Sequence, residues 1–223
     1  MYIDALVIRF RNKIAYNEIP LFRGAIISAM GSNCSPIFHN HKDDGFHYRY
    51  PLVQYKRIYG QAAIVFISYW AEEVVSLFGN GECSLKLGDS PAVLFSVQAV
   101  HPYHTAVEIS PEPFLYHISD WLPLNPQNFS RYQSMKGVVE RTQLLERILV
   151  GNILSACKGL GITMQDTIEC KIVNIQDPIV VKYKAMPYLT FSCDFECNLA
   201  MPDYIGLGKG ASMGHGTISH IIQ

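Results

Sequence analysis

Histidines and aspartates are crowded into one segment near the N-terminus, FHNHKDDGFHYRY over residues 38–50, called here the histidine segment. The pair His39 and His41 forms a His-x-His pattern, and Lys42 and Tyr48 add an ammonium and a phenol. Three interpretations fit these residue types. The imidazoles could bind a metal ion with nearby carboxylates, they could carry out acid–base chemistry without a metal, or the segment could be a polar surface loop rich in histidine.

A second segment suited to chemistry is the glycine loop, GLGKGASMGHG over residues 206–216, with five glycines in eleven residues. Glycine permits positive φ angles and lets backbone N–H groups approach a phosphate closely. The loop therefore predicts a contact with a phosphate backbone, and the alternative is a flexible surface hairpin. The residues expected to make this contact are Gly206, Gly208, Lys209, Gly210, Ser212, Gly214, His215 and Gly216.

Two familiar phosphate-binding motifs do not explain the glycine loop. Gly206, Gly208 and Ala211 match the dinucleotide fingerprint, but only twelve residues follow, too few for the helix and strand which that motif needs. A P-loop requires Gly-Lys followed by Ser or Thr, and the sequence contains no such tripeptide.

The charges are unevenly distributed although the net charge is only −1. Residues 1–60 contain eight Lys and Arg against four acidic residues, whereas residues 61–120 contain one against seven. Such a distribution suits local phosphate contacts better than the coating of a polyanion. Ordinary scatter of surface charge explains it equally well.

Several features indicate the compartment. No apolar run reaches about 18 residues without a charge, which argues against a membrane span, and Asp4 and Arg9 interrupt the N-terminal apolar stretch, unlike a signal peptide. The six cysteines are scattered without a Cys-x-x-Cys pair, which favours free thiols in a reducing compartment. We therefore expect a cytoplasmic protein.

The spacing of apolar residues predicts the elements that would position these groups. Residues 2–10 are rich in Ile, Val and Phe and predict a strand, and a helical pattern begins at Pro20 and ends at Gly31. The later elements of this half are strands over residues 50–55 and 61–67, a helix over residues 70–78, and a strand over residues 83–87. The order β-α-β-β-α-β is that of RNA-recognition and ferredoxin-like domains.

The second half repeats this order in part. Four prolines mark residues 91–113 as a connecting region with some strand character. The expected elements are then a strand over residues 114–124, a helix over 137–158, strands over 168–175 and 179–184 joined by a turn at Gln176-Asp177-Pro178, and strands over 189–199 and 217–222. The second helix of this half is short or missing.

We therefore predict an α+β fold of two tandem ferredoxin-like (RRM-like) βαββαβ domains. The first, residues 1–110, would carry the histidine segment, and the second, residues 111–223, would carry the glycine loop.

This layout resembles the CRISPR-associated Cas-six family, the endoribonucleases of the RAMP superfamily that cut precursor CRISPR RNA. The residues that carry the resemblance to its b-type branch are FRGA at 22–25, FHNHK at 38–42 and YRYPLVQYK at 48–56. The resemblance implies cleavage without metal or cofactor, in which the ribose 2′-OH attacks the adjacent phosphate. The products would carry a 2′,3′-cyclic phosphate and a 5′-hydroxyl.

The resemblance also assigns roles to residues. His39 and His41 would be the general base and general acid in an order left open, Tyr48 would position or polarise the reacting group, and Lys42 would act electrostatically. The residues expected to follow the RNA backbone are Arg49, Lys56 and Arg57.

The partner implied by the resemblance is CRISPR repeat RNA, with proteins of a CRISPR effector complex or a second copy of the chain as further candidates. Two other functions stay open. One is a noncatalytic RNA-binding RAMP subunit of an effector complex, and the other is a histidine-rich metal-dependent hydrolase.

Overall fold

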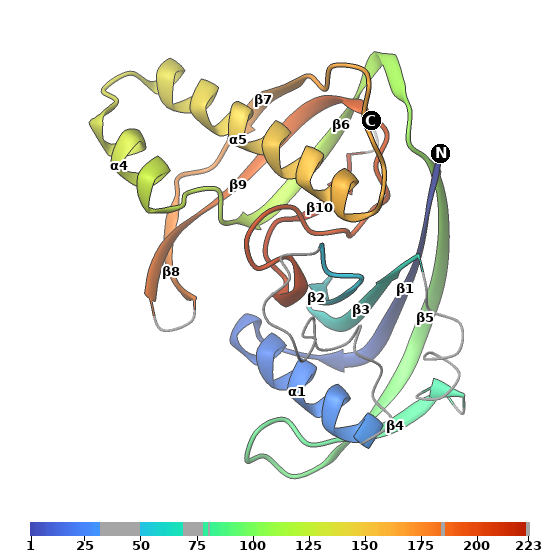
Figure 1. Ribbon diagram of the computed structural model, residues 1–223. Helices are drawn as coiled ribbons and strands as arrows, with labels where there is room; N and C mark the ends of the chain where they lie inside the picture. Colours follow the sequence, from blue (N-terminus) through green and yellow to red (C-terminus); the bar gives the residue numbers. More distant parts are fainter. Residues whose placement is uncertain (32–49, 69–77, 80, 184–185, 222–223) are drawn as a thin grey trace, which may run out of the picture. The chain divides into compact units, whose positions relative to one another are not determined.

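The computed structural model of the chain describes residues 1–31, 50–68, 78–79, 81–183 and 186–221 (Figure 1). The chain forms two compact units, each with its own sheet. The N-terminal unit comprises Tyr2–Thr105 together with Ser212–Gly214, and the C-terminal unit comprises the remaining residues. No helix in these ranges is long and apolar enough to cross a membrane.

The sheet of the N-terminal unit has the strand order β2-β3-β1-β5-β4. Its strands are β1 (Tyr2–Lys13), β2 (Val53–Ile58), β3 (Gln61–Ile67), β4 (Glu82–Leu85) and β5 (Val93–Ala106). Between β1 and β2 lie the 3-10 turn η1 (Tyr16–Glu18) and helix α1 (Ile19–Met30). The order β2-β3-β1-β5 is that of a ferredoxin-like sheet, which confirms the predicted fold class in this unit.

The strand that completes this arrangement differs from the predicted one. The sequence predicts it over residues 83–87, but β4 forms only an edge ladder with the start of β5, and β5 itself lies beside β1. The strands β5 and β6 (Ile109–Trp121) also occupy the region that the prolines mark as a connection, so that prediction was wrong. The predicted helix over residues 70–78 falls outside the described residues except for Phe78.

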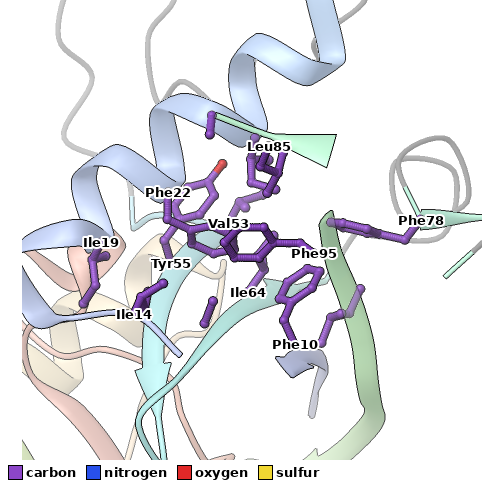
Figure 2. Close-up of a cluster of buried hydrophobic side chains, with 14 of the residues drawn as sticks. Phe10, Ile14, Ile19, Phe22, Val53, Tyr55, Ile64, Phe78, Leu85 and Phe95 are labelled. Atoms are coloured by element: carbon purple, nitrogen blue, oxygen red, sulfur yellow. The ribbon is translucent and has the colours of Figure 1, made fainter. Parts of the chain in front are cut away.

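One face of the N-terminal sheet is covered by α1. Ile19, Phe22 and Ile26 lie on one helical stripe and are fully buried. The ring of Phe22 stacks on Phe95 of β5 at a centroid distance of 5.5 Å and meets Phe10 of β1 edge-on at 5.7 Å (Figure 2). Burial of a side chain of this size contributes about 1.5–3 kcal/mol. This aromatic cluster therefore fixes α1 on the sheet.

The opposite face of the same sheet is buried as well. Gln54 and Lys56 of β2 lie directly across from Val65 and Ala63 of β3, so the four side chains share one face. All four have 0% exposure. A fully buried lysine is unusual, because removing an ammonium group from water is costly.

The C-terminal unit has the sheet order β10-β6-β9-β7, with β8 also pairing with β9. Its other strands are β7 (Cys170–Ile175), β8 (Ile179–Tyr183), β9 (Met186–Leu199) and β10 (Thr217–His220). The helical segments are α4 (Pro126–Ser134), α5 (Val138–Gly159) and the 3-10 turn η3 (Ala211–Met213). This order again matches a ferredoxin-like sheet.

Helix α5 confirms the clearest helix prediction. It lies across the sheet of its unit (Figure 1) and buries a stripe that includes Leu145, Leu149 and Ile153. Residues 200–216, all described, contain no helix other than η3, which confirms that the second helix is missing here. Helix α4 was not predicted. Its N-terminus is capped by Asn125, whose side-chain oxygen accepts a hydrogen bond from the N–H of Asn128 at 2.8 Å.

The predicted hairpin at residues 176–178 was wrong. Strands β7 and β8 do not pair with each other, because both pair with β9 along the same edge, Ile175 with Cys193 and Ile179 with Thr190. Residues 176–178 therefore interrupt one long edge strand, where Pro178 has no N–H to place in the ladder.

The five described cysteines are free thiols, as predicted. Cys157, Cys193 and Cys197 are buried, and Cys83 and Cys170 are half-buried.

Candidate nucleic-acid interface

The glycine loop (residues 206–216) connects β9 to β10 and folds back on itself. The N–H of Leu207 donates to the carbonyl oxygen of Gly216 at 2.8 Å, and the N–H of His215 donates to that of Gly210 at 3.3 Å. Main-chain hydrogen bonds therefore close the loop at its base, between residues 207 and 216, and again nearer its tip, between residues 210 and 215. This arrangement favours a specifically folded loop over the alternative of a flexible surface hairpin.

Packing requires glycine at two positions of the loop. Gly216 has a φ of +62°, and a Cβ atom there would overlap the carbonyl oxygen of Leu207. Gly208 has a φ of +79°, and a Cβ atom there would overlap Oδ1 of Asn152, which accepts a hydrogen bond from Nε1 of Trp121 at 2.9 Å. Only glycine combines this backbone conformation with so little space.

Only part of the loop is open to a ligand. Gly206, Gly214 and Gly216 are buried, and the N–H of Gly216 donates to the carbonyl oxygen of Asp120 at 3.3 Å. Lys209 is exposed. The remaining predicted residues are half-buried, namely Gly208, Gly210, Ser212 and His215. A phosphate contact would therefore fall on the stretch around Lys209, and the three buried glycines serve the loop's own structure.

Two tyrosines that the sequence reasoning missed lie beside this stretch. Nζ of Lys209 donates to the hydroxyl of Tyr188 at 2.9 Å and lies 4.3 Å from the centroid of the same ring. Tyr183 meets the Tyr188 ring nearly perpendicularly at a centroid distance of 5.9 Å. The sequence did not predict the pairing of β8 with β9 that brings the two tyrosines together, nor their proximity to the glycine loop.

His215 is held in one orientation. Its Nδ1 lies 3.0 Å from the carbonyl oxygen of Asp120, and its ring meets Tyr183 edge-on at 5.3 Å. Because a carbonyl oxygen can only accept, Nδ1 carries the proton in this contact. In the neutral ring Nε2 is then the acceptor nitrogen.

Only two of the site residues predicted in the N-terminal half lie within the described residues. His39, His41, Lys42, Tyr48 and Arg49 lie outside the described residues. Across the described ranges no three His, Cys, Asp or Glu residues are grouped so as to hold a metal ion. The described residues therefore do not test the predicted arrangement of the catalytic residues.

Lys56 and Arg57 are described, and they differ sharply. Burial lowers the pKa of Lys56 to about 7, and its side chain has no exposed surface. The expected contact of Lys56 with an RNA backbone stays a prediction, and the burial of its side chain does not favour it. Arg57 is exposed, and its Nε donates to the carbonyl oxygen of Ile14 at 2.9 Å, which leaves its terminal nitrogens near the surface.

A polar row crosses the C-terminal sheet. Nδ1 of His117 donates to Oδ1 of Asp194 at 2.6 Å, and Nδ2 of Asn174 donates to the other carboxylate oxygen at 3.0 Å. The His117 hydrogen bond holds the pKa of Asp194 below its usual value. About a quarter to a third of each of the His117 and Asp194 side chains is exposed. Sequence reasoning missed this row, although strict alternation along β9 places polar residues on one face.

Comparison with known families identifies two matching family models. The model described as Cas6b N-terminal domain matches residues 1–101, and the model described as Cas6b C-terminal domain matches residues 108–221. An uncharacterized protein of Methanocaldococcus jannaschii is 36% identical over 104 residues, which are 47% of this chain and 69% of that protein.

Solved structures share the fold over nearly the whole chain. A crystal structure of Cas6b has a TM-score of 0.85 at 25% identity and covers 99% of this chain and 100% of that one. A crystal structure of a CRISPR RNA processing endoribonuclease Cas6b has a TM-score of 0.75 at 23% identity, with 99% and 100% covered. A more distant match is a Cas6 product complex, with a TM-score of 0.61 at 12% identity over 98% of this chain and 100% of that one.

Proposed function

The chain belongs to the Cas6b family, and from this membership we propose that it is an endoribonuclease that cuts precursor CRISPR RNA within the repeats. The observation that carries the proposal is the match of both family models, which together leave only a few residues of the chain outside. The likeness to a CRISPR RNA processing endoribonuclease Cas6b supports the fold on which that activity would rest.

We propose that cleavage needs no metal. The ribose 2′-OH attacks the adjacent phosphorus, the bond to the leaving 5′ oxygen breaks, and the products carry a 2′,3′-cyclic phosphate and a 5′-hydroxyl. This step needs one group to accept the 2′-OH proton and another to donate a proton to the leaving oxygen. His39 and His41 suit these roles because imidazole titrates near neutral pH. Tyr48 would position the reacting group and Lys42 would stabilise the charged phosphorane.

The exposed part of the glycine loop is the proposed contact with the RNA backbone. Lys209 offers a charge, and Ser212 and His215 offer hydrogen-bonding groups. Arg49 and Arg57 are further proposed contacts with the RNA backbone. Effector-complex proteins and a second copy of the chain stay predictions, and light scattering of the purified protein with and without repeat RNA would measure the second.

The test is a cleavage assay with repeat RNA in excess EDTA, repeated with a single 2′-deoxy nucleotide at the cut site. Cleavage in EDTA that disappears with the 2′-deoxy substrate supports the proposal. Tight binding without cleavage would instead indicate a noncatalytic RNA-binding subunit, and activity that returns only with added metal would indicate a metal-dependent hydrolase.

The residue assignments have their own test. His39→Ala and His41→Ala should each abolish cleavage while the dissociation constant for repeat RNA changes less than about threefold, because the histidines act on the transition state. His220→Ala is a matched control, since His220 pairs with Asp203 at 2.9 Å on β10 and has no role in the proposal. Parallel loss of binding and cleavage would count against the assignment.

A further inference from the structure

Two tyrosines form a corner at the free end of the β8–β9 ribbon. Val181 lies directly across from Tyr188, so Tyr183, two residues further along β8, points to the same face as Tyr188. Their rings are 5.9 Å apart and inclined at 82°. Both side chains are half-buried, and Met186, which is 61% exposed, extends the same face. Two perpendicular rings can accept a planar group that stacks on one ring and meets the edge of the other.

A fixed cation lies beside this corner. Nζ of Lys209 is bonded to the Tyr188 hydroxyl at 2.9 Å and lies 4.3 Å from the ring centroid. An ammonium group has three donor hydrogens, and the Tyr188 hydroxyl occupies one of them. The tyrosine therefore holds an exposed and otherwise flexible lysine in one place, with donors to spare for an anion. On the other side, the ring of His215 meets Tyr183 at 5.3 Å.

The side chains of Tyr183, Tyr188, Lys209 and His215 are chemically complementary to a nucleotide. An unpaired base offers a planar π surface, and its phosphate offers a negative charge one sugar away. None of the four side chains is acidic, so nothing within the cluster repels a phosphate. Aromatic rings stack on any base, and a cation next to them adds attraction for the backbone.

We propose that Tyr183 and Tyr188 bind an unpaired base of the RNA and that Lys209 binds a phosphate of the same or the adjoining nucleotide. The proposal rests on the proposed function for its ligand, and it goes further by assigning base stacking to two tyrosines that lie outside both the histidine segment and the glycine loop. The site would bind unpaired bases in preference to paired ones. It would distinguish little between the four bases, because no hydrogen bond to a base edge is involved.

The experiment is a thermodynamic cycle between protein and RNA. Repeat RNAs are prepared with one abasic nucleotide at each position in turn, and their dissociation constants are measured by fluorescence anisotropy for the wild-type protein, Tyr188→Ala and Tyr183→Ala. We expect one or two positions at which loss of the base weakens wild-type binding about 5- to 150-fold. The same abasic RNAs should bind Tyr188→Ala no more weakly than intact RNA does, since the ring is already gone.

Two variants guard against a trivial result. Tyr188→Phe keeps the ring and loses only the hydroxyl, so it should bind intact RNA within about threefold of wild type and retain the abasic effect. Tyr2→Ala removes a tyrosine that is 60% exposed in the other unit and should leave the abasic profile unchanged. Thermal melting by circular dichroism identifies any variant that fails to fold.

The outcomes separate this proposal from the proposed function. If wild type binds and cuts repeat RNA but the tyrosine variants show the full abasic effect at every position, the stacking site is disproved and the corner must serve another class of ligand, such as a protein. If wild type neither binds nor cuts repeat RNA, the proposed function fails first and the stacking site fails with it.

Discussion

The two sheets of this protein have the same strand order but opposite surface character. In the N-terminal unit both faces of the central strands are buried, and even Gln54 and Lys56 have no exposed surface. In the C-terminal unit β9 alternates between buried and half-buried residues from Phe191 to Leu199, and His117 and Asp194 meet on its polar face. The same strand order can thus form either a sheet whose central side chains are buried or a sheet with one polar face open to solvent.

This difference bears on where each unit can do chemistry. Strand β3 is buried on both faces and offers no side chain to a ligand, so candidate chemistry in the N-terminal unit falls to the histidine segment and to exposed strand positions such as Arg57. A sheet with one polar face can add its own side chains to those of its loops. In the C-terminal unit the glycine loop and the β8–β9 ribbon meet through Lys209 and Tyr188.

The largest expected effect tests the buried core of the N-terminal sheet. Phe22→Ala should lower the free energy of unfolding by about 3–5 kcal/mol, because it removes a fully buried ring that stacks on Phe95. Leu21→Ala, at the neighbouring and 43% exposed position of α1, should cost about 1 kcal/mol or less. Urea denaturation measures both. Equal costs would show that this face of the sheet is less tightly packed than its burial indicates.

The second test concerns the buried lysine. The pKa of Lys56 falls from 10.5 to about 7 on folding, so between these values the unfolded chain binds a proton that the folded chain does not. Stability must therefore rise with pH, by up to about 1.4 kcal/mol per unit or roughly 3 kcal/mol between pH 7.5 and 9.5. Lys56→Met should flatten this rise in urea denaturation, whereas Lys86→Met, at an exposed position, should not. An unchanged slope in Lys56→Met would mean that the ammonium is solvated.

The third test compares two glycines of the C-terminal unit. Gly216→Ala should destabilise the fold by about 1–3 kcal/mol, because its φ of +62° and the nearby Leu207 carbonyl oxygen leave no room for a methyl group. Gly151→Ala, in helix α5 with nothing within 4 Å, should stabilise it by about 0.5–1 kcal/mol. Thermal melting of the pair is sufficient, and a neutral Gly216→Ala would contradict a tightly closed loop.

The smallest expected effect lies on the polar face. The His117 hydrogen bond lowers the pKa of Asp194, so its stabilisation is present above the ordinary aspartate pKa and is lost as the pH falls through the lowered value. Asp194→Asn should therefore cost less than about 1 kcal/mol at pH 7 and nothing in strong acid. Glu196→Gln, on the same face of β9, is the control. A cost of several kcal/mol at pH 7 would make this face part of the core.

Much of the fold could be read from periodicity. The helix over residues 137–158 and the strands over residues 2–10 and 61–67 match α5, β1 and β3 closely, since long apolar patterns specify both element and buried face. The prolines led to wrong predictions in two places, residues 91–113 and residues 176–178. Pro111 and Pro113 lie within β6, between Ile109 and Phe114, where the register with β9 shifts and the ladder does not need every N–H.

The site could be predicted only in part, because sequence distance hides spatial neighbours. The glycine loop was recognised from composition, yet only the structure shows that three of its glycines are buried and that Tyr183 and Tyr188 lie beside Lys209. The family resemblance suggested Lys56 as a contact for the RNA backbone. Its burial opposite Ala63 could not be predicted, because no alternation pattern in the sequence marks that face as buried.

The pairing of β10 with β6 has a consequence for how the protein is made. Ile218 pairs with Ile118, one hundred residues earlier, and both are fully buried. During translation β6 therefore waits with one edge unpaired until β10 leaves the ribosome, and an unpaired edge is a template for pairing with other nascent chains. We expect fragments that stop before Thr217 to aggregate, and slow translation between β9 and β10 to lower the yield of folded protein.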